Sequence, residues 1–146
     1  MKDLQPTELN FKLDLKPAKE LPKGFYEVIN PLFVFKQIFS EGGNKCIANL
    51  IIPAGEIIYV GLHSKSRKDK ITQECMLKMR ASKAYVHSIV REMDHKQLKE
   101  GRSWWVFNFK YNVGAIVKPS NRFLDEQDVC GSGIHFFFNV NSALLF

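Results

Sequence analysis

Cys130 and His135 are the pair of residues in this sequence with the clearest potential for chemistry. A thiolate beside an imidazole is a reactive combination of nucleophile and base. Positions five apart in a strand point to opposite faces, so only the glycine turn at Gly131 and Gly133 could bring the two side chains together. The alternative is a small buried thiol and a histidine that is hydrogen-bonded in the core, and we favour it. Cys130 and His135 remain catalytic candidates, and no catalytic residue is assigned.

The cysteines and histidines as a set do not predict a metal centre. A structural zinc site needs four ligands, usually with close pairs such as CxxC. Here the candidate ligands are scattered singly along the chain: Cys46, His63, Cys75, His87, His95, Cys130 and His135. The sequence also lacks a Walker A loop, a GxSxG turn and an HExxH helix. We therefore expect neither a metal nor a cofactor.

The positive charge of the chain is concentrated in one segment. Residues 63–102 hold eleven Lys and Arg against five Asp and Glu, which accounts for the whole formal charge of +6, because the rest balances at ten against ten. Such a patch can neutralise phosphates and bind nucleic acid without sequence preference. The candidate contacts are Lys65, Arg67, Lys68, Lys70, Lys78, Arg80 and Lys83. The alternative is a solvated loop, which we favour because aromatic residues do not interleave with these charges.

The elements that must position these residues are mostly strands. Apolar runs at 47–52 and 57–60 predict two strands joined by a turn, and 85–90 predicts a further strand. Residues 103–112 alternate between aromatic and polar side chains, which is typical of a half-buried antiparallel strand. Residues 71–84 have few β-branched side chains and suit a short helix, whereas 134–138 predict a strand before a helical turn. The prediction is an α+β fold, mainly antiparallel β with a few short helices.

The chain has the length and composition of one globular domain with an extension. Hydrophobic residues make up 45% of its 146 positions and charged residues 25%. Residues 1–23 carry three prolines and an alternating stretch, so they predict an extended N-terminal arm that lies on its own domain or on a partner subunit. Residues 24–146 are expected to form a single domain.

The cellular setting can also be predicted from the sequence. Three widely spaced cysteines are a poor disulfide framework and fit a reducing compartment. The first residues lack the apolar core of a signal peptide, and no apolar run approaches the roughly 20 residues that span a bilayer. We therefore expect an intracellular protein that is neither secreted nor bound to a membrane.

The three consecutive phenylalanines, Phe136, Phe137 and Phe138, predict a core strand that is buried on both faces. If one face stayed uncovered, it would form an exposed apolar patch, which usually marks a subunit contact. Trp104, Trp105 and the proline-bearing arm add to this apolar surface. A symmetric homodimer is therefore expected.

Three segments together resemble an uncharacterised domain family of large DNA viruses and phages, in which the domain often stands beside repeat modules. The segments are `KMRASKAYVHSI`, `YNVGAIVKP` and `CGSGIHFF`, within residues 76–146. The most specific positions are Arg80, Ala81, Ser82, Lys83, Cys130, Gly133, Ile134, His135 and Phe136. Met79 stands where a cysteine is common in that family, which weakens a paired-thiol site. The last helix also departs from the family, with Asn141, Ser142 and Phe146 in place of an acidic pair and a tyrosine.

A second resemblance concerns the same C-terminal stretch. In ADP-ribosyltransferases a similar strand flanks the nicotinamide pocket, and His135 stands here at the position that tyrosine usually holds. An upstream histidine–glycine pair and a glutamate on a closing strand have no convincing match. The leading hypothesis is a non-enzymatic viral protein, a small basic homodimer with a binding or structural role. It is expected to be packaged in the virion or to act early in the infected host cell. An ADP-ribosyltransferase-like enzyme and a nonspecific nucleic-acid-binding protein are the alternatives.

Overall fold

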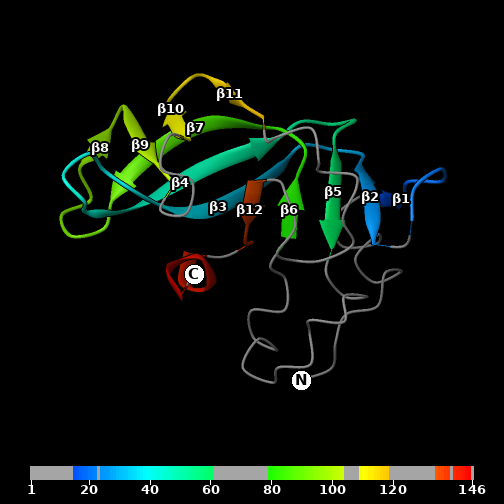
Figure 1. Cartoon of the computed structure of the whole chain (residues 1–146), viewed down its shortest axis with the longest axis horizontal. Helices are drawn as coiled ribbons and strands as arrows, with labels where there is room; N and C mark the ends of the chain where they lie inside the picture. The colour runs from blue at the N-terminus through cyan, green and yellow to red at the C-terminus, as the bar shows by residue number, and fades with distance from the viewer. Residues whose placement is uncertain are drawn as a thin grey trace.

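The chain folds into antiparallel β-structure in a computed structural model that describes residues 15–22, 24–60, 79–103, 109–118, 134–138 and 140–145 (Figure 1). In these ranges the strands form a five-stranded and a seven-stranded sheet. The five-stranded sheet is ordered β1 (Leu15–Pro17), β2 (Phe25–Val28), β5 (Ile57–Val60), β6 (Met79–Ala81) and β12 (Ile134–Phe136). The seven-stranded sheet runs from β10 (Lys110–Asn112) through β9 (Glu100–Arg102), β3 (Leu32–Phe39), β4 (Lys45–Ile52) and β7 (Ala84–Arg91) to β11 (Ile116–Val117), with β8 (Gln97–Leu98) beside β7.

The long strands form because their apolar residues alternate with a period of two. In β4, Cys46, Ala48, Leu50 and Ile52 are each at most 1% exposed, while the residues between them point to the other face of the sheet. Successive side chains of a strand leave its two faces in turn, so one face of β4 lies wholly in the core. The larger of these side chains, Leu50 and Ile52, each contribute roughly 1.5–3 kcal/mol when fully buried.

The two sheets enclose one core because the chain crosses repeatedly between them. The connections from β2 to β3, from β4 to β5 and from β6 to β7 each link a strand of one sheet to a strand of the other. At the β4–β5 connection, Gly55 adopts φ 88° and its N–H donates to the Val28 carbonyl over 2.7 Å. The main core holds the inward side chains of both sheets, among them Tyr26, Val60, Phe136 and Tyr111. Burial raises the pKa of Tyr26 and of Tyr111.

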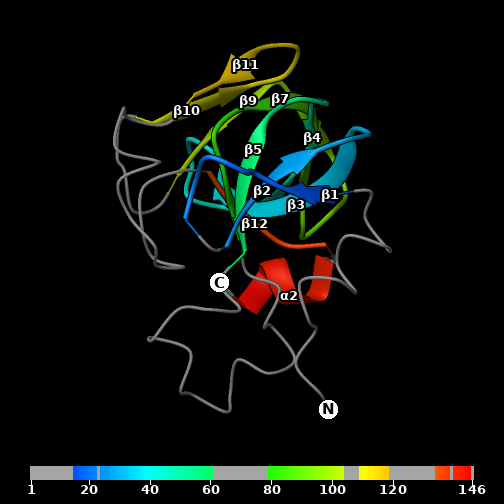
Figure 2. The same ribbon diagram turned by 90° about the vertical axis from the view of Figure 1, so that its right-hand side faces the viewer.

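The C-terminal segment joins the sheets and then covers part of an outer face. Phe35 of β3 and Phe137 exchange two backbone hydrogen bonds of 2.8 Å, immediately after β12. Helix α2 (Val140–Leu145) packs against β3, where Ala143 and Phe137 cluster with Ile47 (Figure 2). Phe136 therefore faces the main core while Phe137 faces the second cluster, so this pair is buried on both faces, as the sequence predicts.

The mainly antiparallel β architecture is confirmed, although α2 is the one helix in the described ranges and the α+β label fits only loosely. The predicted strands at 47–52, 57–60 and 85–90 lie within β4, β5 and β7. The predicted helix at 71–84 is wrong for its described part, because β6 occupies 79–81 and pairs with strands on both sides. Half of the aromatic strand expected at 103–112, residues 104–108, falls outside the described residues, and β10 occupies its end at 110–112. No helix in the described part of the chain is long and apolar enough to cross a membrane.

Candidate functional site

A row of four side chains crosses the outer face of the five-stranded sheet. Phe25 on β2 is the register partner of Tyr59 on β5, Tyr59 pairs with Arg80 on β6, and Arg80 pairs with His135 on β12. Register partners in antiparallel strands project from the same face, about 5 Å apart. The strand pairing thus brings together Arg80 and His135, which come from two of the three segments that carry the family resemblance.

Arg80 is completely buried, with 0% of its surface exposed. Its guanidinium carbon lies 4.6 Å from the ring centroid of Tyr59 and 5.7 Å from that of Phe25. The two rings meet edge to face at 4.9 Å. A planar, weakly hydrated guanidinium stacks on aromatic rings at a lower desolvation cost than an ammonium group would. The aromatic residues at 25 and 59 thus give this cation an environment that tolerates its burial.

Gly24 makes room for Tyr59. It adopts φ 98°, and a Cβ built there would lie 2.7 Å from Tyr59 Cε1. Its carbonyl accepts a 2.8 Å hydrogen bond from the Val60 N–H, which holds the backbone against β5. Glycine is therefore required at this position by both the backbone conformation and the close approach of the ring.

His135 is half-buried at the end of the row. Its backbone carbonyl accepts a 3.2 Å hydrogen bond from Lys36 Nζ, which reaches across from β3 of the other sheet. Arg80, the register partner of His135, is fully buried, so a substrate in solution has no direct access to its guanidinium. The row joins β2, β5, β6 and β12 through side chains on one face of the sheet.

The turn after β6 is fastened by a small polar cluster. Ser82 Oγ accepts a hydrogen bond from the Ile57 N–H and donates one to Glu56 Oε1, each 3.1 Å long. The other oxygen of Glu56 lies 3.9 Å from Lys83 Nζ, and both side chains are partly buried. Ser82 and Lys83, two of the positions in the resemblance, thus fix the crossing from β6 to β7 onto the β4–β5 turn.

Some of the site residues predicted from the sequence lie outside the described ranges, and the others, Arg80, Lys83 and His135, lie inside them. Cys130 and the basic residues Lys65, Arg67, Lys68, Lys70 and Lys78 lie outside the described residues, so their roles stay predictions. Arg80 is proposed by the sequence as a nucleic-acid contact, but its burial places it out of reach of a phosphate in this structure. Lys83 is at the surface beside Glu56.

Cys46 is the described cysteine, and it is fully buried. Its Sγ lies 3.4 Å from the Asn44 carbonyl oxygen, and burial raises the pKa of the thiol. A thiol with a raised pKa is a poor nucleophile. Within the described ranges, no group of three or more His, Cys, Asp or Glu side chains is placed to hold a metal ion.

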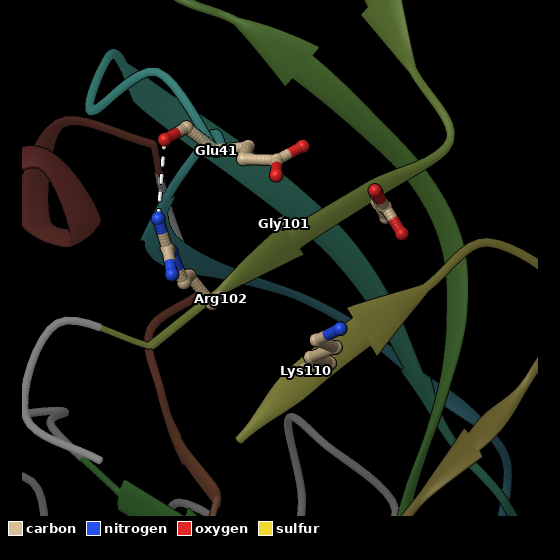
Figure 3. A pocket seen from close by; sticks show the side chains of 5 residues that line it. Glu41, Gly101, Arg102 and Lys110 are labelled. Atoms are coloured by element: carbon tan, nitrogen blue, oxygen red, sulfur yellow. Dashed lines mark hydrogen bonds between the residues drawn. The ribbon is translucent and has the colours of Figure 1, made fainter. Parts of the chain in front are cut away.

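A small hollow lies at the far end of the seven-stranded sheet, lined by Glu41, Glu100, Gly101, Arg102 and Lys110 (Figure 3). Arg102 Nη2 donates a 3.1 Å hydrogen bond to the Glu41 carbonyl oxygen, which ties β9 to the β3–β4 turn. The volume is about 80 Å³, against roughly 300–1,000 Å³ for a typical small-molecule site. This hollow is too small to enclose a metabolite.

The most exposed apolar feature is a row across the outer face of the seven-stranded sheet, here named the apolar row: Phe33, Ile51, Tyr85 and Ile116. Phe33 on β3 pairs with Ile51 on β4, Ile51 with Tyr85 on β7, and Tyr85 with Ile116 on β11. Phe33 is 70% exposed and Ile116 56%, while the two central residues are half-buried. Four strands thus present one uninterrupted line of apolar side chains to solvent.

The apolar row was not foreseen from the sequence, although one signal was present. The first four residues of β3, `LFVF`, are all apolar, so apolar side chains leave both faces of the strand. A strand with one solvent face usually alternates between apolar and polar residues. α2 covers the second outward phenylalanine, Phe35, and leaves Phe33 open.

Comparison with known proteins places the chain in a family without an assigned activity. Residues 22–143 match the model of a family of unknown function (DUF5758), and because the match spans most of the chain, the protein belongs to this family. No curated protein and no solved structure matches the chain. The viral setting stays a prediction from the resemblance.

Proposed function

We propose that this protein is a binding or structural protein rather than an enzyme, and that the apolar row is its binding surface. The observation that carries the proposal is the exposure of Phe33 and Ile116 at the two ends of a continuous apolar line. Scattered exposed apolar residues are normal, but contiguous ones usually mark a contact with another molecule.

The polar features of the described residues support the same proposal. Arg80 is fully buried against two aromatic rings, the thiol of Cys46 is buried, and the hollow at Arg102 is small. The packaging of the protein in a virion, its early action in an infected cell and its binding of nucleic acid through residues 63–102 rest on the sequence alone and are part of this proposal only as predictions.

Site-specific photo-crosslinking tests the binding surface. A benzophenone analogue of phenylalanine replaces Phe33 in cells that produce the protein, and the same analogue at Met93 is the matched control. Met93 is 73% exposed but lies on the turn between β7 and β8, away from the apolar row. We expect covalent adducts from position 33 and few from position 93. Equal or absent adducts at the two positions would remove the apolar row as a binding surface.

The enzyme alternative needs a separate measurement. The purified protein is incubated with labelled NAD and mixed acceptors, and its thermal shift with NAD is compared between wild type and His135→Ala. We expect neither turnover nor an NAD-dependent shift that the substitution removes. NAD consumption that His135→Ala abolishes would replace the binding proposal with an ADP-ribosyltransferase-like activity.

A further inference from the structure

The apolar row alternates in side-chain type as well as in strand. From one end to the other it reads Phe33, Ile51, Tyr85 and Ile116, so aromatic and aliphatic residues take turns. A line of this kind is complementary to itself when reversed. A reversed copy laid on top places Phe33 against Ile116 and Ile51 against Tyr85, which sets a flat ring on a branched aliphatic chain at every position.

We propose that the occupant of the apolar row is a second copy of this chain, related by a two-fold axis that passes between Ile51 and Tyr85. This inference rests on the proposed function and names the partner of the same surface. Closed two-fold dimers are the commonest soluble oligomers, and in them residue i contacts j while j contacts i. The alternating row meets that requirement without any rearrangement.

The surface charge also favours a second copy. Two molecules that each carry a formal charge of +6 repel unless they meet through a neutral surface. The four residues of the apolar row are uncharged, and so are the outward partners one step along the strands, Phe35 and Asn49. On the other side of the apolar row lie Lys83, which is paired with Glu56, and Lys118, so we expect the contact to extend towards Phe35 and Asn49 and to leave these two lysines at its rim.

The polar side chains beside the apolar row can be buried by a second copy with a small desolvation penalty. Asn49 Nδ2 donates a 2.7 Å hydrogen bond to Ser88 Oγ, so these two side chains satisfy each other on the sheet surface. Burying a polar group that already has a partner avoids most of the desolvation penalty of about 1–3 kcal/mol. The face can therefore extend beyond the apolar row into the next row of residues.

The available area sets the strength of the contact. Given the 70% and 56% exposure of its end residues, the apolar row offers about 300 Å² of surface, taking about 200 Å² for each complete side chain. A stable interface buries about 800 Å² per partner, so the apolar row would form the centre and its flanks the rest. We therefore expect a dimer that dissociates on dilution within the micromolar range rather than a permanent one.

Charge substitutions at the two ends of the apolar row test the arrangement by sedimentation velocity. In a dimer of Phe33→Asp, each carboxylate faces Ile116 of the other copy, and Ile116→Lys places each ammonium on Phe33. We expect each single variant to raise the dissociation constant at least about 30-fold. Mixing the two variants should restore dimers, because one end then pairs Asp with Lys and the other end is wild type.

Two controls define the register and the fold. Mixing Phe33→Asp with Phe33→Lys should not restore dimers, because residue 33 of one copy does not face residue 33 of the other. Met93→Asp, equally exposed and outside the apolar row, should leave the dissociation constant unchanged. Circular dichroism and thermal unfolding confirm that each variant is folded before its mass is interpreted.

The outcomes separate this inference from the proposed function. Rescue by Phe33→Asp with Ile116→Lys supports the two-fold arrangement. A wild type that stays monomeric, single variants that remain dimeric, or rescue by the two residue-33 variants instead, would each overturn it. A monomer whose photo-adducts at position 33 contain a different protein would keep the binding surface and exclude the second copy.

Discussion

Arg80 and His135 are direct partners across β6 and β12, and this pairing joins two segments that are far apart in the sequence. On its other side, Arg80 pairs with Tyr59 and lies over its ring. The guanidinium is thus an inner member of the row, between Tyr59 on β5 and His135 on β12. A buried cation at this position makes the register of β6 costly to change.

Arg80→Ala is expected to lower the free energy of unfolding by about 3 kcal/mol or more, because it removes the ring stacking and leaves a large cavity. Arg80→Lys keeps the charge but loses the planar group, and we expect a loss of about 1–2 kcal/mol. Urea unfolding followed by circular dichroism measures both. Lys83→Ala, which removes a partly exposed contact with Glu56, should cost less than about 1 kcal/mol. Equal costs for the alanine variants at 80 and 83 would contradict the central place of Arg80.

Gly24→Ala is expected to destabilise the protein more than Gly55→Ala. Both glycines adopt positive φ, 98° and 88°, so both alanines incur the backbone cost of about 1–2 kcal/mol. A Cβ at Gly24 would also lie 2.7 Å from Tyr59 Cε1, whereas a Cβ at Gly55 meets nothing within 4 Å. The clash should add roughly 1–3 kcal/mol. Thermal unfolding of the two variants side by side measures the difference, and equal melting temperatures would argue against the close packing of Tyr59.

The strands with a clear apolar pattern could be predicted, but β6 could not. β4 and β5 follow from their own apolar pattern and the turn between them. β6 has three residues, Met79, Arg80 and Ala81, and all three types favour helices, so local propensity indicates the wrong element. Its strand conformation comes from hydrogen bonds to β5 and β12, which are non-local contacts.

The candidate site was equally hard to foresee, for the same physical reason. A basic residue in a basic segment is usually solvated, and Arg80 is buried only because strand pairing sets it beside Tyr59. The apolar row likewise depends on the register of four strands. Sequence alone shows that Phe33 and Ile116 are apolar but not that they share a face.

Cys46 is expected to resist alkylation in the folded protein. Its side chain is fully buried, and the raised pKa of its thiol leaves little thiolate at neutral pH. Iodoacetamide labelling followed by peptide mass spectrometry should find Cys46 unmodified until denaturant is added, and then modified rapidly. The denatured sample serves as the control for intrinsic reactivity. Rapid labelling under native conditions would mean that the β4 side of the core opens readily.

Asp94 makes the stability of the β7–β8 turn depend on pH in the acid range. Arg91 donates to both carboxylate oxygens, over 2.9 and 2.6 Å, and this pairing lowers the pKa of Asp94 from 3.8 to about 2. A lowered folded-state pKa means that the unfolded chain takes up the proton first. The stabilisation is therefore complete above pH 3.8 and is lost as the pH falls through about 2. Asp94→Asn should be less stable than wild type at neutral pH, and the gap should close over that window.

Urea midpoints of the wild type and Asp94→Asn, measured from neutral pH down to about pH 2, test this dependence. Glu92→Gln is the matched control, since it removes a carboxylate from the same turn but leaves the pair between Arg91 and Asp94 intact. The urea midpoint of Glu92→Gln should still show the loss of stability at acid pH that comes from Asp94, whereas the midpoint of Asp94→Asn should not. A gap between wild type and Asp94→Asn that is constant with pH would show that Arg91 does not hold the carboxylate in its charged form, because a lowered pKa must appear as a pH-dependent difference in stability.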